Sequence, residues 1–152
     1  MKPLREIWMK VGIEKIDMHE RVTVKALLDS GATGMFVDRK FSEKHGFRME
    51  KLDRPSKVTN MDGTNNVRRS ITHKIECNTY YRGHVERIRM DVYNLGRIEV
   101  ILGMPWLAAH NPDIDWKKGE VKMIRCPPIC GRNIQVERKE TKEMAVSQAP
   151  RG

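Results

Sequence analysis

The sequence is poor in cysteine, and this absence limits the compartments and folds that are open to it. Its 152 residues include only Cys77, Cys126 and Cys130, an odd number with a spacing that does not make a disulfide framework. We therefore expect a reducing compartment, the cytoplasm. No apolar run approaches the length of a membrane span, and no signal-peptide pattern opens the chain. These absences argue against a disulfide scaffold and against a membrane location.

Signals for several kinds of catalytic site are also missing. The sequence has no phosphate-binding glycine loop and no Ser-His-Asp or Cys-His arrangement. Cys126 and Cys130 enclose Pro-Pro-Ile and lack both the two-residue spacing and the trailing histidine of a zinc knuckle, so we expect structural or incidental thiols. The histidines show no metal-ligand spacing, and we expect each at the surface or in a turn: His19, His45, His73, His84 and His110. The sequence predicts no metal site and no cofactor.

Charge, in contrast, is abundant and mostly of one sign. The formal net charge is +9 and the pI about 9.7. Such a balance is typical of partners of polyanions or of a domain with a basic neighbour in a polyprotein. Because Lys and Arg are spread along every segment, a solvated surface is favoured, and nucleic acid is only weakly indicated as a partner. Hydrophobic residues make up 39% of the chain, enough for one modest core.

Short segments of alternating polarity dominate the chain. They predict strands at residues 7–13, 22–28, 35–37, 71–77, 88–92 and 98–102, a hairpin at 55–67 around Asp62-Gly63, and a last hairpin at 114–124. A short helix is predicted after the capping residue Asp38, ending at Gly46. A second is predicted from Pro105 and stops before Asn111-Pro112. The pattern indicates an all-β fold, a small barrel or sandwich with two short helices.

The periodic pattern ends near residue 125. We therefore predict one domain at residues 1–125 and a polar tail at 126–152, disordered from about Glu137 onward.

The sequence contains three tryptophans, Trp8, Trp106 and Trp116. We expect them in the core rather than as platforms on which nucleic-acid bases stack.

The segment at residues 26–33, Ala-Leu-Leu-Asp-Ser-Gly-Ala-Thr, carries the strongest chemical signal. It places the carboxylate of Asp29 at the end of an apolar strand, directly before a Ser-Gly turn. Taken alone, Asp-Ser-Gly is also an ordinary turn sequence. Its place in the chain is more informative, because the Asp62-Gly63 hairpin follows it, and Val-Ile-Leu-Gly at residues 100–103 follows that hairpin.

This order resembles one lobe of an aspartic protease: a catalytic loop, a flap, and an apolar strand ending in glycine that crosses beneath the loop. The chain looks most like the protease domain of Ty3/gypsy-type LTR retrotransposons. The resemblance is carried by residues 26–33 with Phe-Val-Asp at 36–38, by 100–107 (Val-Ile-Leu-Gly-Met-Pro-Trp-Leu) and by 111–116 (Asn-Pro-Asp-Ile-Asp-Trp). It covers roughly residues 7–124. It implies a small closed β-barrel of the acid-protease (retropepsin-like) type, with one lobe per chain.

The resemblance also implies an aspartic endopeptidase that processes its own polyprotein in the cytoplasm or within virus-like particles. Peptide hydrolysis of this kind needs two facing carboxyls that share one proton. Only Asp29 is followed by Ser-Gly in this sequence, so the second aspartate must come from a second copy of the chain. We therefore expect a homodimer with the site on its two-fold axis.

The resemblance implies a role for each residue of the loop and of the hairpin turn. Catalysis is assigned to Asp29, with Ser30 as an anchor of the loop and Gly31 allowing a sharp turn. Substrate binding is assigned to Ala32 and Thr33 in the loop and to Met61, Asp62 and Gly63 in the flap. For Thr33, a solvated turn position is an equal alternative, and for Asp62-Gly63 the alternative is an exposed hairpin turn.

Two other functions stay open at this point. One is a retropepsin-like domain that serves only as a dimerisation or binding module, because a fold does not prove activity. The other is a cellular protease of the ubiquitin-shuttle type, whose catalytic loop is also Asp-Ser-Gly-Ala. The blocks at residues 104–107 and 111–116 favour the retrotransposon protease.

Overall fold

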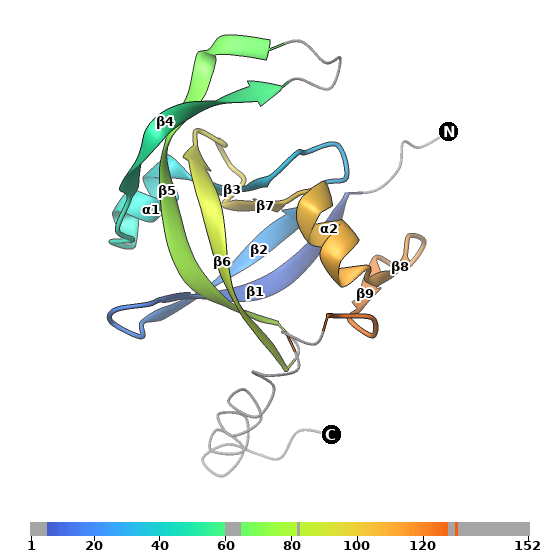
Figure 1. The fold of residues 1–152 in the computed structure, drawn as a ribbon. Coiled ribbons are helices and arrows are strands. Elements are labelled where there is room, and N and C mark those ends of the chain that lie inside the picture. The colour runs from blue at the N-terminus through green and yellow to red at the C-terminus, as the bar shows by residue number, and fades with distance from the viewer. Residues whose placement is uncertain (1–5, 60–64, 82, 128–129, 131–152) are drawn as a thin grey trace.

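Six strands close into a barrel because the first strand pairs on both of its edges. The computed structural model describes residues 6–59, 65–81, 83–127 and 130. Their elements, in chain order, are β1 (Ile7–Lys15), β2 (Arg21–Leu28), β3 (Met35–Asp38), α1 (Arg39–Lys44), β4 (Glu50–Thr59), β5 (Asn65–Tyr81), β6 (His84–Tyr93), β7 (Val100–Leu102), α2 (Met104–His110), β8 (Asp113–Asp115) and β9 (Glu120–Lys122) (Figure 1).

The barrel contains β1, β2, β7, β3, β6 and β5 in that order, and β1 then pairs with β5 to close the ring. Closure brings Gly12 opposite Tyr80. β4 lies outside the ring, bonded to β5 alone, and β8 and β9 form a separate two-stranded sheet. The prediction of an all-β closed barrel with two short helices is thus confirmed for the described residues.

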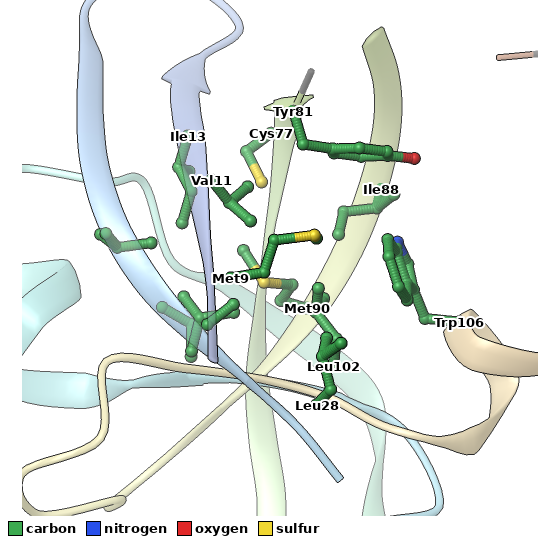
Figure 2. Close-up of a cluster of buried hydrophobic side chains, with 14 of the residues drawn as sticks. Met9, Val11, Ile13, Leu28, Cys77, Tyr81, Ile88, Met90, Leu102 and Trp106 are labelled. Atoms are coloured by element: carbon green, nitrogen blue, oxygen red, sulfur yellow. The ribbon is translucent and has the colours of Figure 1, made fainter. Parts of the chain in front are cut away.

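Alternate residues of the strands build the core inside this ring. On β1, Met9 and Val11 are buried in the same cluster as Met90 of β6 and Leu102 of β7 (Figure 2), and Ile7 is buried on the same face of the strand. Each such aliphatic side chain contributes about 1.5–3 kcal/mol when it is removed from water. The period-two alternation of β1 therefore supplies one wall of a core shared by most of the strands.

Of the three tryptophans that we expected in the core, only one is buried there. Trp106 on α2 is buried, with 2% of its surface exposed. Trp8 is 38% exposed because it alternates with Ile7 and Met9 and so lies on the outer face of β1. Trp116 is 50% exposed because it follows β8 into the turn of the small two-stranded sheet. The prediction of a core position for Trp8 and Trp116 is therefore wrong.

The arm formed by β4 and β5 is longer than the sequence predicted. β4 begins at Glu50 rather than near Pro55, and the strand predicted at residues 71–77 is part of the long β5. The register between the two strands shifts between Lys51 and Ser56. Pro55 falls in this interval, and proline has no N–H to give to a ladder. The predicted hairpin is confirmed by the pairing of Thr59 with Asn65, although its turn at residues 60–64 lies outside the described residues.

Both predicted helices are present. Asp38 caps α1 through a hydrogen bond from the Phe41 N–H to its Oδ2 (3.1 Å), and Gly46 follows at φ +70°. α2 carries Pro105 in its first turn and ends at Asn111, which adopts the left-handed conformation. Within the described residues, no helix is long and apolar enough to cross a membrane.

Packing against the barrel continues past the domain limit predicted at residue 125. Cys126 is half-buried and Cys130 is completely buried. Cys126 and Cys130, in the predicted tail, therefore pack against the barrel, because they lie near His84 at the start of β6 and Cys130 lies near His110 at the end of α2.

Candidate active site

A loop at residues 29–34, called here the Asp29 loop, connects β2 to β3. It starts where β2 ends its parallel pairing with β7, and the Asp29 N–H donates to the Leu102 carbonyl at 3.0 Å. The Gly31 N–H donates to Asp29 Oδ1 at 2.9 Å, and the Ala32 N–H donates to the Asp29 carbonyl at 3.1 Å. Backbone groups thus fix the turn and the direction of the carboxylate.

Gly103 lies directly beneath this loop, as the predicted crossing strand requires. A Cβ atom at Gly103 would stand 2.7 Å from the Ala32 carbonyl oxygen and closer still to that of Gly34. The next residue, Met104, donates its N–H to the Ala32 carbonyl at 2.9 Å. Only glycine allows this approach, so the junction of β7 and α2 serves as the support of the loop.

The side chains of the loop are left free by this backbone support. Asp29 is half-buried, and Ser30, Gly31 and Thr33 are exposed. Among the described residues, Asp29 makes one side-chain hydrogen bond, to Gly31, and the hydroxyls of Ser30 and Thr33 make none. The anchoring role of Ser30 and the substrate role of Thr33 stay predictions. One oxygen of the carboxylate is left for a second group.

The predicted flap lies on the β4–β5 arm. This arm rises from the end of the barrel where the loop between β2 and β3 also lies (Figure 1). Its substrate residues Met61, Asp62 and Gly63 fall in residues 60–64, outside the described part of the chain, and their role stays a prediction.

A second group of polar side chains, which the sequence did not predict, gathers at the other end of α2. We call His84, His110, Cys126 and Cys130 the Cys–His cluster. Ligand atoms of His84, Cys126 and Cys130 lie within 4.8 Å of one another, as do those of Glu86, His110 and Cys130. His110 is 1% exposed, so its predicted surface position is wrong. The four residues come from three separate segments, and the sequence contained no spacing that could reveal the cluster.

Burial affects the acid–base chemistry of this region. Loss of solvent raises the pKa of Cys126 to about 12, and it also raises the pKa of Cys130. The pKa of Tyr81, whose hydroxyl contacts His110 Nδ1 at 3.2 Å, is raised by the same cause. The free protein therefore holds both thiols in their neutral form at neutral pH.

A protein-family model and solved structures are similar to this chain, and the fold is that of retropepsin-like domains. Residues 25–130 match the model of the PEG10/RTL1 protease domain. The retroviral protease-like domain of Ddi1 from Leishmania major is similar in structure, with a TM-score of 0.53 and 21% sequence identity over 80% of this chain and 89% of that one. A retropepsin-like aspartic protease from Rickettsia conorii has a TM-score of 0.43 and 18% identity over 76% of this chain and 91% of its own. The family match spans the Asp29 loop, the arm and the Cys–His cluster.

Proposed function

We propose that this chain, which belongs to the PEG10/RTL1 protease domain family, is an aspartic endopeptidase active as a homodimer. The observation that supports this function is the Asp29 loop. Its backbone is held from below by Leu102, Gly103 and Met104, while its carboxylate is half-buried and makes a single side-chain hydrogen bond among the described residues. Such a loop can present its carboxylate to an identical loop of a second chain.

In the proposed dimer, the two Asp29 carboxyls share one proton. Two carboxyl groups this close cannot both be ionised, because their negative charges would repel each other. The ionised carboxylate therefore takes a proton from the attacking water, and the protonated carboxyl gives its proton to the carbonyl oxygen of the substrate. The apparent pKa values then belong to the pair rather than to either residue. Ser30 and Gly31 hold this geometry, and Ala32 is small enough to allow the partner loop to approach.

The proposed substrate is a polyprotein that contains this domain, of the Ty3/gypsy retrotransposon type. The sequence blocks at residues 100–107 and 111–116 support this origin. Processing would take place in the cytoplasm, including virus-like particles. The arm of β4 and β5 would close over the peptide, with Met61, Asp62 and Gly63 at its tip and Ala32 and Thr33 on the opposite side.

The experiment is cleavage of the upstream polyprotein by the purified chain, with and without a pepstatin-like inhibitor. Asp29→Asn is the inactive variant, and Asp17→Asn, in the exposed turn after β1, is the matched control. We expect inhibitor-sensitive cleavage by the wild type and by the control only. Cleavage that persists in Asp29→Asn would reject the mechanism, and no cleavage by the wild type would favour a binding or dimerisation module.

Mixing experiments test the homodimer separately. If each chain gives one aspartate, then adding excess Asp29→Asn chain to a fixed amount of wild type should suppress activity through inactive mixed dimers. Specific activity should also fall on dilution through the dimer dissociation constant. A bell-shaped pH profile would report the shared proton. Activity that is unaffected by dilution and by the mutant chain would show that one chain suffices.

A further inference from the structure

The Cys–His cluster joins three parts of the chain that are distant in sequence. His84 begins β6, His110 ends α2, and Cys126 and Cys130 follow β9. His84, Cys126 and Cys130 form one trio of ligand atoms within 4.8 Å of one another, and Cys130 also belongs to a second trio with His110 and Glu86. Cys130 Sγ lies 3.5 Å from His110 Nδ1. The cluster thus offers two sulfur and two nitrogen donors on either side of Cys130, and two sulfurs with two nitrogens are a donor set of tetrahedral zinc sites.

The outer partner of His110 is already in place. Its Nε2 lies 3.0 Å and 3.1 Å from the two carboxylate oxygens of Glu86. A carboxylate on one ring nitrogen fixes the tautomer and raises the basicity of the other, which is how histidines that bind zinc are commonly held. With Nε2 engaged by Glu86, Nδ1 faces the Tyr81 hydroxyl at 3.2 Å and Cys130 Sγ at 3.5 Å, so a metal ion bound to Nδ1 would displace its contact with Tyr81.

His84 shows the same arrangement, and its free nitrogen is otherwise unexplained. The ring makes a hydrogen bond to the backbone of Met123. Its Nδ1 is buried and has no hydrogen-bond partner. An unpaired buried nitrogen of this kind costs about 1–3 kcal/mol of desolvation unless something binds it. His84 belongs to the trio with Cys126 and Cys130, so a metal ion held there on Nδ1 would satisfy that nitrogen.

We propose that His84, His110, Cys126 and Cys130 bind one zinc ion, with Glu86 and the Met123 backbone as the outer partners of the two histidines. Tetrahedral zinc with bonds of about 2.0–2.3 Å places its ligand atoms about 3.3–3.8 Å apart. The 3.5 Å between Cys130 Sγ and His110 Nδ1 already meets this requirement, and binding must draw the ligand atoms of the two trios closer together. Binding displaces the two thiol protons to solvent, giving a site of two thiolates and two neutral imidazoles.

All four ligand positions are protein side chains, which is the pattern of a structural rather than a catalytic zinc. The ion would fasten the segment after β9 to the start of β6 and to the end of α2. Because the other end of α2 supports the Asp29 loop, the ion would also fix the orientation of that helix. Zinc binding does not depend on the proposed protease function, since it is measured without any peptide cleavage.

The test starts with the metal content of the full-length chain. The protein is purified with a thiol-free reductant and without chelator, and its zinc is measured by elemental mass spectrometry. We expect one zinc per chain. The chelated protein is then titrated with Co²⁺ alone, which should give thiolate-to-cobalt charge-transfer bands and the intense d–d bands of tetrahedral cobalt. Glu86→Gln should weaken zinc binding by about 10–100-fold, as expected for loss of an outer partner.

Matched variants separate the site from general damage. Cys126→Ser, Cys130→Ser and His110→Gln should each lose the zinc and the cobalt spectrum. Cys77→Ala removes the third, core cysteine, and His19→Asn changes an exposed histidine, so both should keep them. If the wild type carries no zinc and gives no thiolate-to-cobalt band, the proposal is overturned, even if the ligand variants fail to fold. A disulfide between Cys126 and Cys130 in the reduced preparation would overturn it as well.

Discussion

The two ends of α2 hold their polar groups in opposite ways. At its start, main-chain atoms of Leu102 and Met104 bond to the Asp29 loop, and Gly103 contributes only the absence of a side chain. At its end, His110 is buried and bonded through its side chain to Glu86, close to the thiol of Cys130. The two regions lie at opposite ends of α2, a helix of seven residues that is about 10 Å long.

This difference shows what each region is suited to. Backbone support leaves the loop side chains exposed, so the Asp29 carboxylate can meet a second molecule. In the Cys–His cluster, by contrast, the polar side chains bond to one another or would bind an ion, so they are not available to a second molecule. A change in a side chain of the Asp29 loop should therefore affect cleavage more than stability, and a change in the Cys–His cluster should do the reverse. The following predictions test this comparison.

Asp29→Asn should give the largest effect, a loss of activity of about 10²–10⁴-fold, because the amide can neither take nor give the proton. Stability should not change, since the amide oxygen can still accept the Gly31 N–H. Kinetics on a peptide substrate and thermal unfolding measure the two quantities. Loss of folding in this variant would contradict our expectation that the negative charge of Asp29 is not needed for the stability of the fold.

Gly103→Ala should damage both properties, because its Cβ would collide with the carbonyl groups of Ala32 and Gly34. Overpacking of this kind costs about 1–3 kcal/mol of unfolding free energy, and displacement of the loop should reduce cleavage as well. Gly34→Ala is the control, since its Cβ meets only the Phe36 ring, at 3.4 Å. Denaturant unfolding compares the two. Equal stability of both variants would show that the junction does not support the loop.

Removal of zinc should lower stability and spare the chemistry. Free zinc at about 100 times its dissociation constant stabilises the folded state by about 2.7 kcal/mol. Chelation should therefore lower the melting temperature, while cleavage well below that temperature continues. The measurement is a melting curve with and without chelator, with Cys130→Ser as the zinc-free reference. If the chelator shifts Cys130→Ser as much as the wild type, the shift does not come from this cluster.

Ser30→Ala should have the smallest effect on stability, within about 0.5 kcal/mol, because the hydroxyl is exposed and has no partner among the described residues. Ser42→Ala, which removes a buried hydrogen bond to the Asp38 carbonyl (2.9 Å), should cost about 1 kcal/mol. A reduced turnover of Ser30→Ala at unchanged stability would support the anchoring role in the dimer. An equal loss of stability in both variants would show that the Ser30 hydroxyl already makes a stabilising interaction within one chain, without the dimer.

Local signals predicted much of the fold. The Asp38 cap and Gly46 predicted α1, Pro105 predicted the start of α2, and alternation predicted most strands of the barrel. These signals are properties of a few neighbouring residues, so the sequence carries them directly. The predictions of burial were wrong where the position of a side chain depends on how its strand pairs and packs with distant parts of the chain. Trp8 has the hydrophobicity of a core residue, yet the register of β1 turns it outward.

The sequence by itself determined that a tight turn carrying Asp29 follows an apolar strand and that a glycine precedes α2, because each of these patterns is made by a few neighbouring residues. Only the tertiary structure decided that β1 closes the barrel onto β5, and that His84, His110, Cys126 and Cys130 meet at the end of α2. Both results depend on segments far apart along the chain. Their meeting follows from the packing of the whole barrel, and no spacing between neighbouring residues records it.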